Sequence, residues 1–282
     1  MNENSTIQLD KLVFSCSSTI KNNFNVIDGK EYDFSPKCYY GETCLTETID
    51  PDNRYKYSYL VDYKDKRMGR VDFCLHSESW TKDRIRFTVD NSAFYNGTLH
   101  CLPAVIKDLS LEVANFSKME IACDNYTQNT EQILRKALKE KENTVKLLGR
   151  KVKDRNKVLN EITYYNHGSL NNPFKQRTTY IRNKKNTFGL KTYDKKEEIK
   201  TISPHKLYIL DYHKQKNPKY RNIYRAEINL YYKEIRRYQK KHNFSITLEN
   251  LLNTDFLNSM FYEYLDRIIV VKNKNKNALE GI

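Results

Sequence analysis

Two segments between residues 178 and 230 constrain the fold more than any other part of this chain. The first is TTYIRNKKNTFGLKTYDKKEE at 178–198, and the second is YRAEINL at 224–230. Alternate side chains of a β-strand share one face of a sheet. A strand over residues 188–195 therefore places three polar side chains on one face, namely Lys191, Tyr193 and Lys195.

The second segment has the same alternation. A strand over residues 224–230 groups Arg225, Glu227 and Asn229 on one face and leaves the apolar side chains on the other. One strand thus offers a phenol between two ammonium groups, and the next offers a carboxylate beside a guanidinium. These groups are suited to attack on a phosphodiester.

The rest of the chain predicts strands followed by helices, in a pattern that occurs twice. We expect an α+β fold built on twisted antiparallel sheet, with flanking helices, a helical C-terminus and two related halves. The predicted domains are one β-rich domain over 1–245, with halves at about 1–128 and 160–245 joined by a helix, and a C-terminal helical segment with a polar tail over 246–282. Only eight glycines occur and none forms a Gly-rich phosphate loop, which disfavours Walker and Rossmann folds.

Three further elements bear on the site. Residues 116–125 predict a strand with Glu120 and Asp124 on one face, and residues 130–148 predict a helix. The strand that carries Glu227 is expected to extend over residues 223–236.

Charge favours a polyanionic partner. The chain has 49 Lys and Arg against 35 Asp and Glu, a formal net charge of +14. Such an excess suits nucleic acid or an anionic membrane surface. AT-rich coding DNA would also enrich Lys, but it would enrich Glu as well, so we prefer nucleic acid.

Nothing in the sequence predicts a membrane or secreted protein. No apolar run approaches the ~20 residues that span a bilayer, and the N-terminal MNENSTIQLD does not resemble a signal peptide. The six cysteines form no CxxC pair. We therefore expect a reduced, cytoplasmic protein without a membrane partner.

Strand transfer by a tyrosine needs an activated phenol, a neutralised phosphate and, usually, a divalent ion. Carboxylates on adjacent strands could hold Mg²⁺ or Mn²⁺, and the candidates are Glu120, Asp124 and Glu227. Residues four apart in a strand are ~13 Å apart, so Glu120 and Asp124 cannot both bind one ion in a regular strand. One of them should join Glu227, and the spacing does not say which.

Each of these residues also has an ordinary structural interpretation. The chain contains 22 tyrosines, and most tyrosines in strands are there because they pack well. A single carboxylate on a polar strand face is usually solvated or ion-paired.

Four motifs, in order, resemble the Rep_trans (replication initiation factor) family of rolling-circle initiators and, more distantly, the replication nickases of filamentous phages. IQLDKLVFS (7–15) is similar to the family's I-D-x-L-x-V-x-F strand, and KMEIACD (118–124) stands where the family has R-x-D-L-A-x-D. The segment at 178–198 has the spacing of an aromatic strand, a small polar turn and R-I-Y-D-K-x-x-E, and YRAEINL matches W-R-x-E-x-x-L. The chain departs from the pattern with Glu120 in place of the first Asp and with Arg182-Asn183 in place of Gly-Ser.

The resemblance implies a sequence-specific DNA nickase that starts rolling-circle replication of a plasmid, phage or mobile element. It would cut single-stranded or cruciform origin DNA, hold the 5′ end as phosphotyrosine and later rejoin the ends. Tyr193 matches the family's Y-D-K and shares a face with Lys191 and Lys195, so it is favoured as the nucleophile, with Tyr180 as the alternative. The catalytic set is completed by Arg225, which with the two lysines would neutralise phosphate. A host helicase and a second copy of the chain are the protein partners to consider, since inverted-repeat origins suit two-fold assemblies.

Two other functions fit the same composition. A non-catalytic DNA-binding protein would use the basic sheet without cleavage, and its binding would be salt-sensitive and independent of divalent ions. A phage structural or cargo protein would pack its basic surface against DNA.

Overall fold

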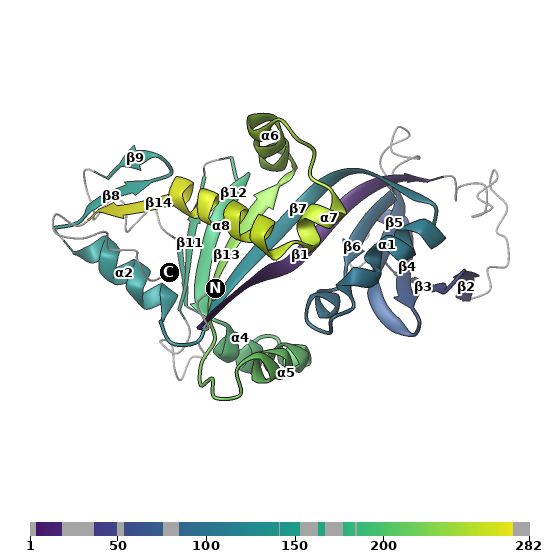
Figure 1. Cartoon of the computed structure of the whole chain (residues 1–282), viewed down its shortest axis with the longest axis horizontal. Coiled ribbons are helices and arrows are strands. Elements are labelled where there is room, and N and C mark those ends of the chain that lie inside the picture. Colours follow the sequence, from purple (N-terminus) through teal and green to yellow (C-terminus); the bar gives the residue numbers. More distant parts are fainter. Residues whose placement is uncertain are drawn as a thin grey trace. The chain divides into compact units, whose positions relative to one another are not determined.

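The computed structural model describes residues 4–18, 37–49, 54–75, 85–140, 142–152, 163–166, 177–183 and 185–272. The chain forms two compact units, the first comprising Met1–Leu9 with Glu120–Ile282 and the second Asp10–Met119. The long strands β1 (Ser5–Ser18) and β7 (Leu111–Asn125) have residues in both units. The predicted α+β class with antiparallel sheet is confirmed (Figure 1).

The second unit is an antiparallel sheet in the order β1-β6-β5-β4-β3-β2. Its other strands and its helices are β2 (Lys37–Tyr40), β3 (Thr43–Thr48), β4 (Tyr55–Tyr63), β5 (Lys66–Leu75), β6 (Ile85–Val89), the 3₁₀ turns η3 (Asn91–Phe94) and η4 (Leu99–Cys101), and α1 (Leu102–Asp108). Phe14 of β1 stacks on Phe87 of β6 with ring centroids 5.0 Å apart, and both side chains are fully buried. Apolar residues that alternate along the strands therefore form this core.

The first unit is built on a sheet in the order β10-β11-β12-β13-β7-β1. Its strands are β10 (Thr163–Asn166), β11 (Arg177–Arg182), β12 (Phe188–Asp194) and β13 (Tyr224–Tyr231), with the parts of β7 and β1 that lie in this unit. A second sheet of three strands has the order β14-β8-β9, formed by β14 (Ile269–Lys272), β8 (Thr144–Leu147) and β9 (Arg150–Lys151).

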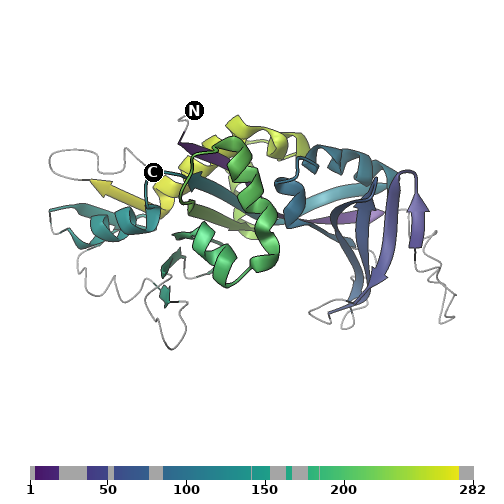
Figure 2. The same ribbon diagram turned by 90° about the horizontal axis from the view of Figure 1, so that it is seen from below.

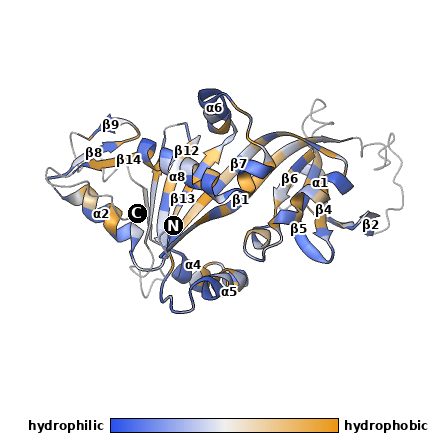
Figure 3. Cartoon of the chain, viewed as in Figure 1, coloured by the Kyte–Doolittle hydropathy of each residue, from blue (hydrophilic) through white to orange (hydrophobic). Residues whose placement is uncertain are grey.

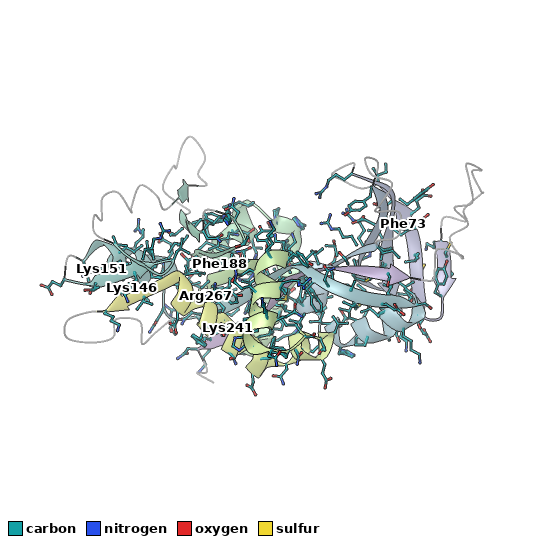
Figure 4. The ribbon with its side chains drawn as sticks, turned by 90° about the horizontal axis from the view of Figure 1, so that it is seen from above. Phe73, Lys146, Lys151, Phe188, Lys241 and Arg267 are labelled. Carbon is teal, nitrogen blue, oxygen red and sulfur yellow. The ribbon has the colours of Figure 1, made fainter. Side chains whose placement is uncertain are left out.

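The helices of the first unit are α2 (Thr130–Lys139), α4 (Lys195–Thr201), α5 (Leu207–Lys216), preceded by the turn η5 (Pro204–Lys206), α6 (Tyr232–His242), α7 (Leu248–Leu252) and α8 (Thr254–Ile268). Helices α2 and α8 pack on one face of the main sheet. Thr179 of β11 donates a hydrogen bond to Glu131 of α2 (3.2 Å), and the Phe188 ring of β12 lies 5.9 Å from that of Tyr264 in α8. Arg267 of α8 lies over Phe188 (Figure 4).

Three predicted elements differ from the structure. The helix expected over 130–148 ends at Lys139, and β8 follows it. The strand expected over 223–236 ends at Tyr231, where α6 begins. The strand expected over 188–195 ends at Asp194, whose carboxylate caps α4 by accepting a hydrogen bond from the Glu197 amide.

Strands β11 and β12 pair as antiparallel neighbours, from Thr179 opposite Thr192 to Arg182 opposite Gly189. Two helices, α7 and α8, occupy the C-terminal segment as expected, but the described chain ends in β14. No helix of the described chain is long and apolar enough to span a bilayer.

Candidate functional site

The face of the main sheet opposite α2 and α8 carries most of the polar residues that the sequence singled out. The strand register sets Tyr180 of β11 opposite Lys191 of β12, and Lys191 opposite Glu227 of β13. It also sets Tyr193 opposite Arg225. Directly opposed residues share a face, so one surface of three adjacent strands holds all five side chains.

Tyr193 is the buried phenol of this face. Its side chain is 1% exposed, and its hydroxyl donates a short hydrogen bond to Oε1 of Glu227. The ammonium of Lys191 lies 4.0 Å from the centroid of the Tyr193 ring and 3.5 Å from Oε2 of Glu227. The predicted phenol, ammonium and carboxylate therefore meet, but the phenol is covered.

Arg225 and Asp124 form a buried ion pair next to Glu227. The guanidinium donates from Nε to Oδ1 of Asp124 at 2.6 Å and from Nη2 to Oδ2 at 2.7 Å, and both side chains are 0% exposed. Nη1 of Arg225 also lies 3.6 Å from Oε1 of Glu227. Burial by itself raises the pKa of Asp124, but the charges of Arg225 and His213 outweigh burial and hold that pKa well below its usual range. Arg225 thus links the two carboxylates from inside the protein.

His213 of α5, which was not predicted from the sequence, completes this cluster. Its Nε2 lies 3.1 Å from Oδ2 of Asp124, and its Nδ1 lies 2.9 Å from the hydroxyl of Tyr126. The imidazole is fully buried. No spacing rule indicates such a residue, because α5 follows β12 in the chain and reaches Asp124 only through the fold. Helices α4 and α5 lie at the front in Figure 2.

Lys195 does not take the place that the sequence predicted. It is the first residue of α4, and its ammonium is 2.9 Å from Oε2 of Glu198 in the same helix. The ammonium remains 5.6 Å from the centroid of the Tyr193 ring. Burial raises the pKa of Glu198, but Lys195 more than offsets burial and lowers it. Lys195 is 2% exposed, so it contacts the Tyr193 ring from the interior of the protein.

Tyr180 is the more accessible of the two candidate phenols. It is half-buried, with the guanidinium of Arg182 lying 4.6 Å from the centroid of its ring and the ammonium of Lys191 lying 5.9 Å away. Cations over an aromatic face attract its electrons and also stabilise a neighbouring anion. Burial lowers the pKa of Lys191, but the charges of Glu227 and Tyr180 raise it overall, so Lys191 is an ammonium at neutral pH.

The structure distinguishes the two acids of β7. Asp124 is engaged by Arg225 and His213, whereas Glu120, also in the β7 strand, is half-buried. Glu120 shares the face of Asp124 by alternation, and β7 is the neighbour of β13. The charge of Glu120 raises the pKa of Lys191 less than the charges of Glu227, Tyr180 and Glu198 do.

A divalent ion would have few protein ligands here. Within the described ranges, no group of three or more His, Cys, Asp or Glu side chains is arranged to hold a metal. Mg²⁺ is often held by only one or two carboxylates, with water and substrate phosphate completing its shell. Glu120 and Glu227 remain the candidate ligands, although Glu227 is itself in contact with Tyr193, Arg225 and Lys191. Asp124 is less suited because Arg225 donates hydrogen bonds to both of its oxygens.

The fold resembles that of a known protein. No protein-family model and no curated protein matches the chain. A search of solved structures found similarity to "Structure of Rolling Circle Replication Initiator Protein from Geobacillus stearothermophilus", with a TM-score of 0.50 and 12% sequence identity over 98% of this chain and 91% of that one. The chain therefore shares the fold of this structure over nearly its whole length.

Proposed function

We propose that this protein is a DNA nickase and strand transferase that initiates rolling-circle replication of a plasmid, phage or mobile element. The observation that carries the proposal is the register of β11, β12 and β13, which lines up Tyr180, Lys191 and Glu227 across one sheet face. Similarity in fold to a rolling-circle initiator and a net charge of +14 support it.

Within this proposal, Tyr180 is the nucleophile and Tyr193 is a positioning residue. A phosphodiester must reach the attacking oxygen, and a hydroxyl on a side chain that is 1% exposed and bonded to Glu227 is covered. Tyr180 is half-buried on the same face, beside the same ammonium. Tyr193 then fixes the orientation of Glu227.

The proposed reaction is a transesterification. The Tyr180 oxygen attacks phosphorus, the bond from phosphorus to the 3′ oxygen breaks, and the 5′ phosphate becomes bound to tyrosine. The phenol loses its proton to solvent and the departing 3′ oxygen takes one up, so the nicked strand ends in a 3′-OH. Reversal of these steps rejoins the ends.

Two cations assist this reaction in the proposal. Lys191 and Arg182 stabilise phenolate and the negative charge that grows on phosphate. Glu120 and Glu227 would hold Mg²⁺ or Mn²⁺, which when bound polarises a phosphoryl oxygen. Arg225 has no exposed surface and acts through Asp124 and Glu227.

The test is incubation of the protein with single-stranded origin DNA and Mn²⁺, followed by mass mapping of the DNA-linked peptide. We expect the adduct on Tyr180, its loss in Tyr180→Phe, and its formation at a reduced rate in Tyr193→Phe. An adduct on Tyr193 would reverse the two roles. No adduct on any tyrosine, with the protein folded and bound to DNA, would end the nickase proposal.

The second candidate is a DNA-binding protein that does not cleave. One observation favours it: Glu227 already has Lys191 and Arg225 beside it, as a neutralised structural carboxylate would. It predicts binding that is unaffected by a metal chelator and no conversion of supercoiled plasmid to nicked circle.

For either candidate, DNA is the proposed partner. Inverted-repeat origins also suit a homodimer, and a host helicase would act on the nicked product. Light scattering of the protein with and without an inverted-repeat duplex tests the dimer.

A further inference from the structure

Helix α6 begins where the site strand β13 ends. The side chains of Arg225, Glu227, Asn229 and Tyr231 alternate along one face of β13, and α6 starts at the next residue. Four strand residues span ~13 Å, so Tyr231 lies about that far from Glu227. Figure 1 shows α6 at the C-terminal end of β13.

The exposed side of α6 is almost entirely cationic. At 100° per residue, its outward arc contains one aromatic and five basic side chains, all of them exposed. These are Tyr232, Lys233, Arg236, Arg237, Lys240 and Lys241. Figure 3 shows the helix hydrophilic along its visible length.

The opposite side of α6 fixes the helix to the protein. Ile235 and Tyr238 are buried, and the Tyr238 ring stacks on Tyr264 of α8 with centroids 5.9 Å apart. Glu234, the only acid of α6, is fully buried and pairs with Arg267 of α8 at 2.8 Å and with Arg237. The helix is therefore held in one orientation, with its cationic arc outward.

Most of the outward cations have no carboxylate to neutralise them. In the part of the chain that the structure describes, no ion pair joins Lys233, Arg236 or Lys240 to an acid, whereas Lys241 pairs with Glu263 at 2.8 Å. Three adjacent positive charges on one rigid helix face form a complement to a polyanion with regularly spaced charges.

Exposed aromatic rings lie beside these charges. Tyr231 is 41% exposed and Tyr232 is 38% exposed, and the guanidinium of Arg236 lies 5.9 Å from the centroid of the Tyr232 ring. An exposed tyrosine is common in proteins, so the informative feature is that these two rings adjoin the cations of α6. Aromatic rings next to a cationic track are the arrangement that binds single-stranded nucleic acid, by stacking on bases while cations contact phosphates.

We propose that Tyr231, Tyr232 and the cationic arc of α6 form a binding surface for the single-stranded DNA that flanks the scissile phosphate. The surface rests on the proposed function, because it assigns a path to the substrate of that site. Single strands are favoured over duplex since paired bases present no face to Tyr231 or Tyr232.

The test measures binding of a fluorescent 20-nucleotide dT strand by anisotropy, with a chelator present so that no cleavage is needed. The variant is Lys233→Ala/Arg236→Ala/Lys240→Ala. The matched control is Lys146→Ala/Lys151→Ala/Lys272→Ala, which removes the same charge from exposed lysines of the small sheet, two of which Figure 4 labels. Circular dichroism verifies that both variants are folded.

We expect the α6 variant to bind about 30-fold more weakly than wild type at 0.1 M salt, and its salt slope to fall by about 2, since each phosphate contact to a single strand contributes ~0.7. The control should stay within about threefold of wild type. Tyr231→Ser/Tyr232→Ser should weaken binding about tenfold or more with an unchanged salt slope, because stacking is worth ~1–3 kcal/mol per base.

Equal losses in the α6 variant and the control would overturn the proposal in favour of a net-charge effect. Equal losses of single strand and of a 20-base-pair duplex would overturn the assignment to single strands, and so would wild-type affinity in the α6 variant. Failure of the nickase proposal looks different: the wild-type protein would bind the strand through α6 and form no adduct when Mn²⁺ is supplied.

Discussion

The buried pair between Arg225 and Asp124 permits a sharp test of what holds the site together. Both side chains are 0% exposed, and two hydrogen bonds of 2.6 and 2.7 Å join them. Replacing Arg225 with Met leaves a carboxylate buried beside His213 without its main counter-charge. Breaking a buried pair in this way costs ~3–5 kcal/mol, a large part of the ~5–15 kcal/mol by which a typical domain is stable.

The assay is urea unfolding followed by circular dichroism. Arg225→Met should lose ~3–5 kcal/mol of unfolding free energy, and Asp124→Leu/Arg225→Met should lose less than the sum of its single changes, because the double variant leaves neither charge unmatched. The control is Lys241→Met, which breaks an ion pair of 2.8 Å whose side chains are 58% and 20% exposed and should cost under ~1 kcal/mol. If Arg225→Met cost no more than Lys241→Met, the interpretation of this cluster as the buried anchor of the site would be refuted.

Three further predictions follow from single contacts. The pKa of Asp124 is held below its usual range in the folded protein and is near ~3.9 in the unfolded protein. The contribution of this carboxylate to stability is therefore fully present above about pH 5 and is lost as pH falls below ~4. Urea midpoints measured from pH 7 to 2 should fall less steeply for Asp124→Asn than for wild type. Lys191→Met should slow adduct formation about 10- to 100-fold by removing a charge beside the reacting phosphate, and Lys191→Arg should restore most of the rate measured with labelled origin DNA. Gly69→Ala should destabilise the protein by ~1–3 kcal/mol in thermal unfolding, because a Cβ there would lie 2.4 Å from the backbone oxygen of Thr88. A Cβ at Gly97 would meet nothing within 4 Å, so Gly97→Ala should cost only the ~1–2 kcal/mol of a left-handed backbone.

Period-two patterns predicted the sheet well because they report a local property. Alternation in β12 and β13 correctly grouped Lys191 with Tyr193 and Arg225 with Glu227, and the observed register sets these pairs opposite each other. Each strand has one polar and one apolar face, so a slip of one residue would bury the wrong set. The face of each residue could therefore be predicted without knowing the partner strand.

Elements that depend on distant partners could not be predicted in this way. Residues 130–148 have apolar side chains at helical spacing, yet Val145 lies in β8 because β8 pairs with β14, more than 120 residues later in the chain. Helix α6 was hidden for another reason. Its buried stripe contains Glu234, which pairs with Arg267 of α8, so the apolar period of that helix is interrupted by a charge that only the fold explains.

The burial of the two candidate tyrosines could not be predicted from the sequence. The register of β11 and β12 places Tyr180 and Tyr193 on the same face, each next to Lys191, whereas alternation in the sequence contains no information on depth. Tyr193 lies opposite Arg225, which is buried together with Asp124 and His213. Tyr180 lies in β11, one strand further from β7 than Tyr193 in β12. A hydroxyl on a covered side chain can orient a carboxylate, but it cannot meet a phosphodiester without moving. The motif match favours Tyr193, but the side chain of Tyr193 is covered, and for this reason Tyr180 is the nucleophile that we propose.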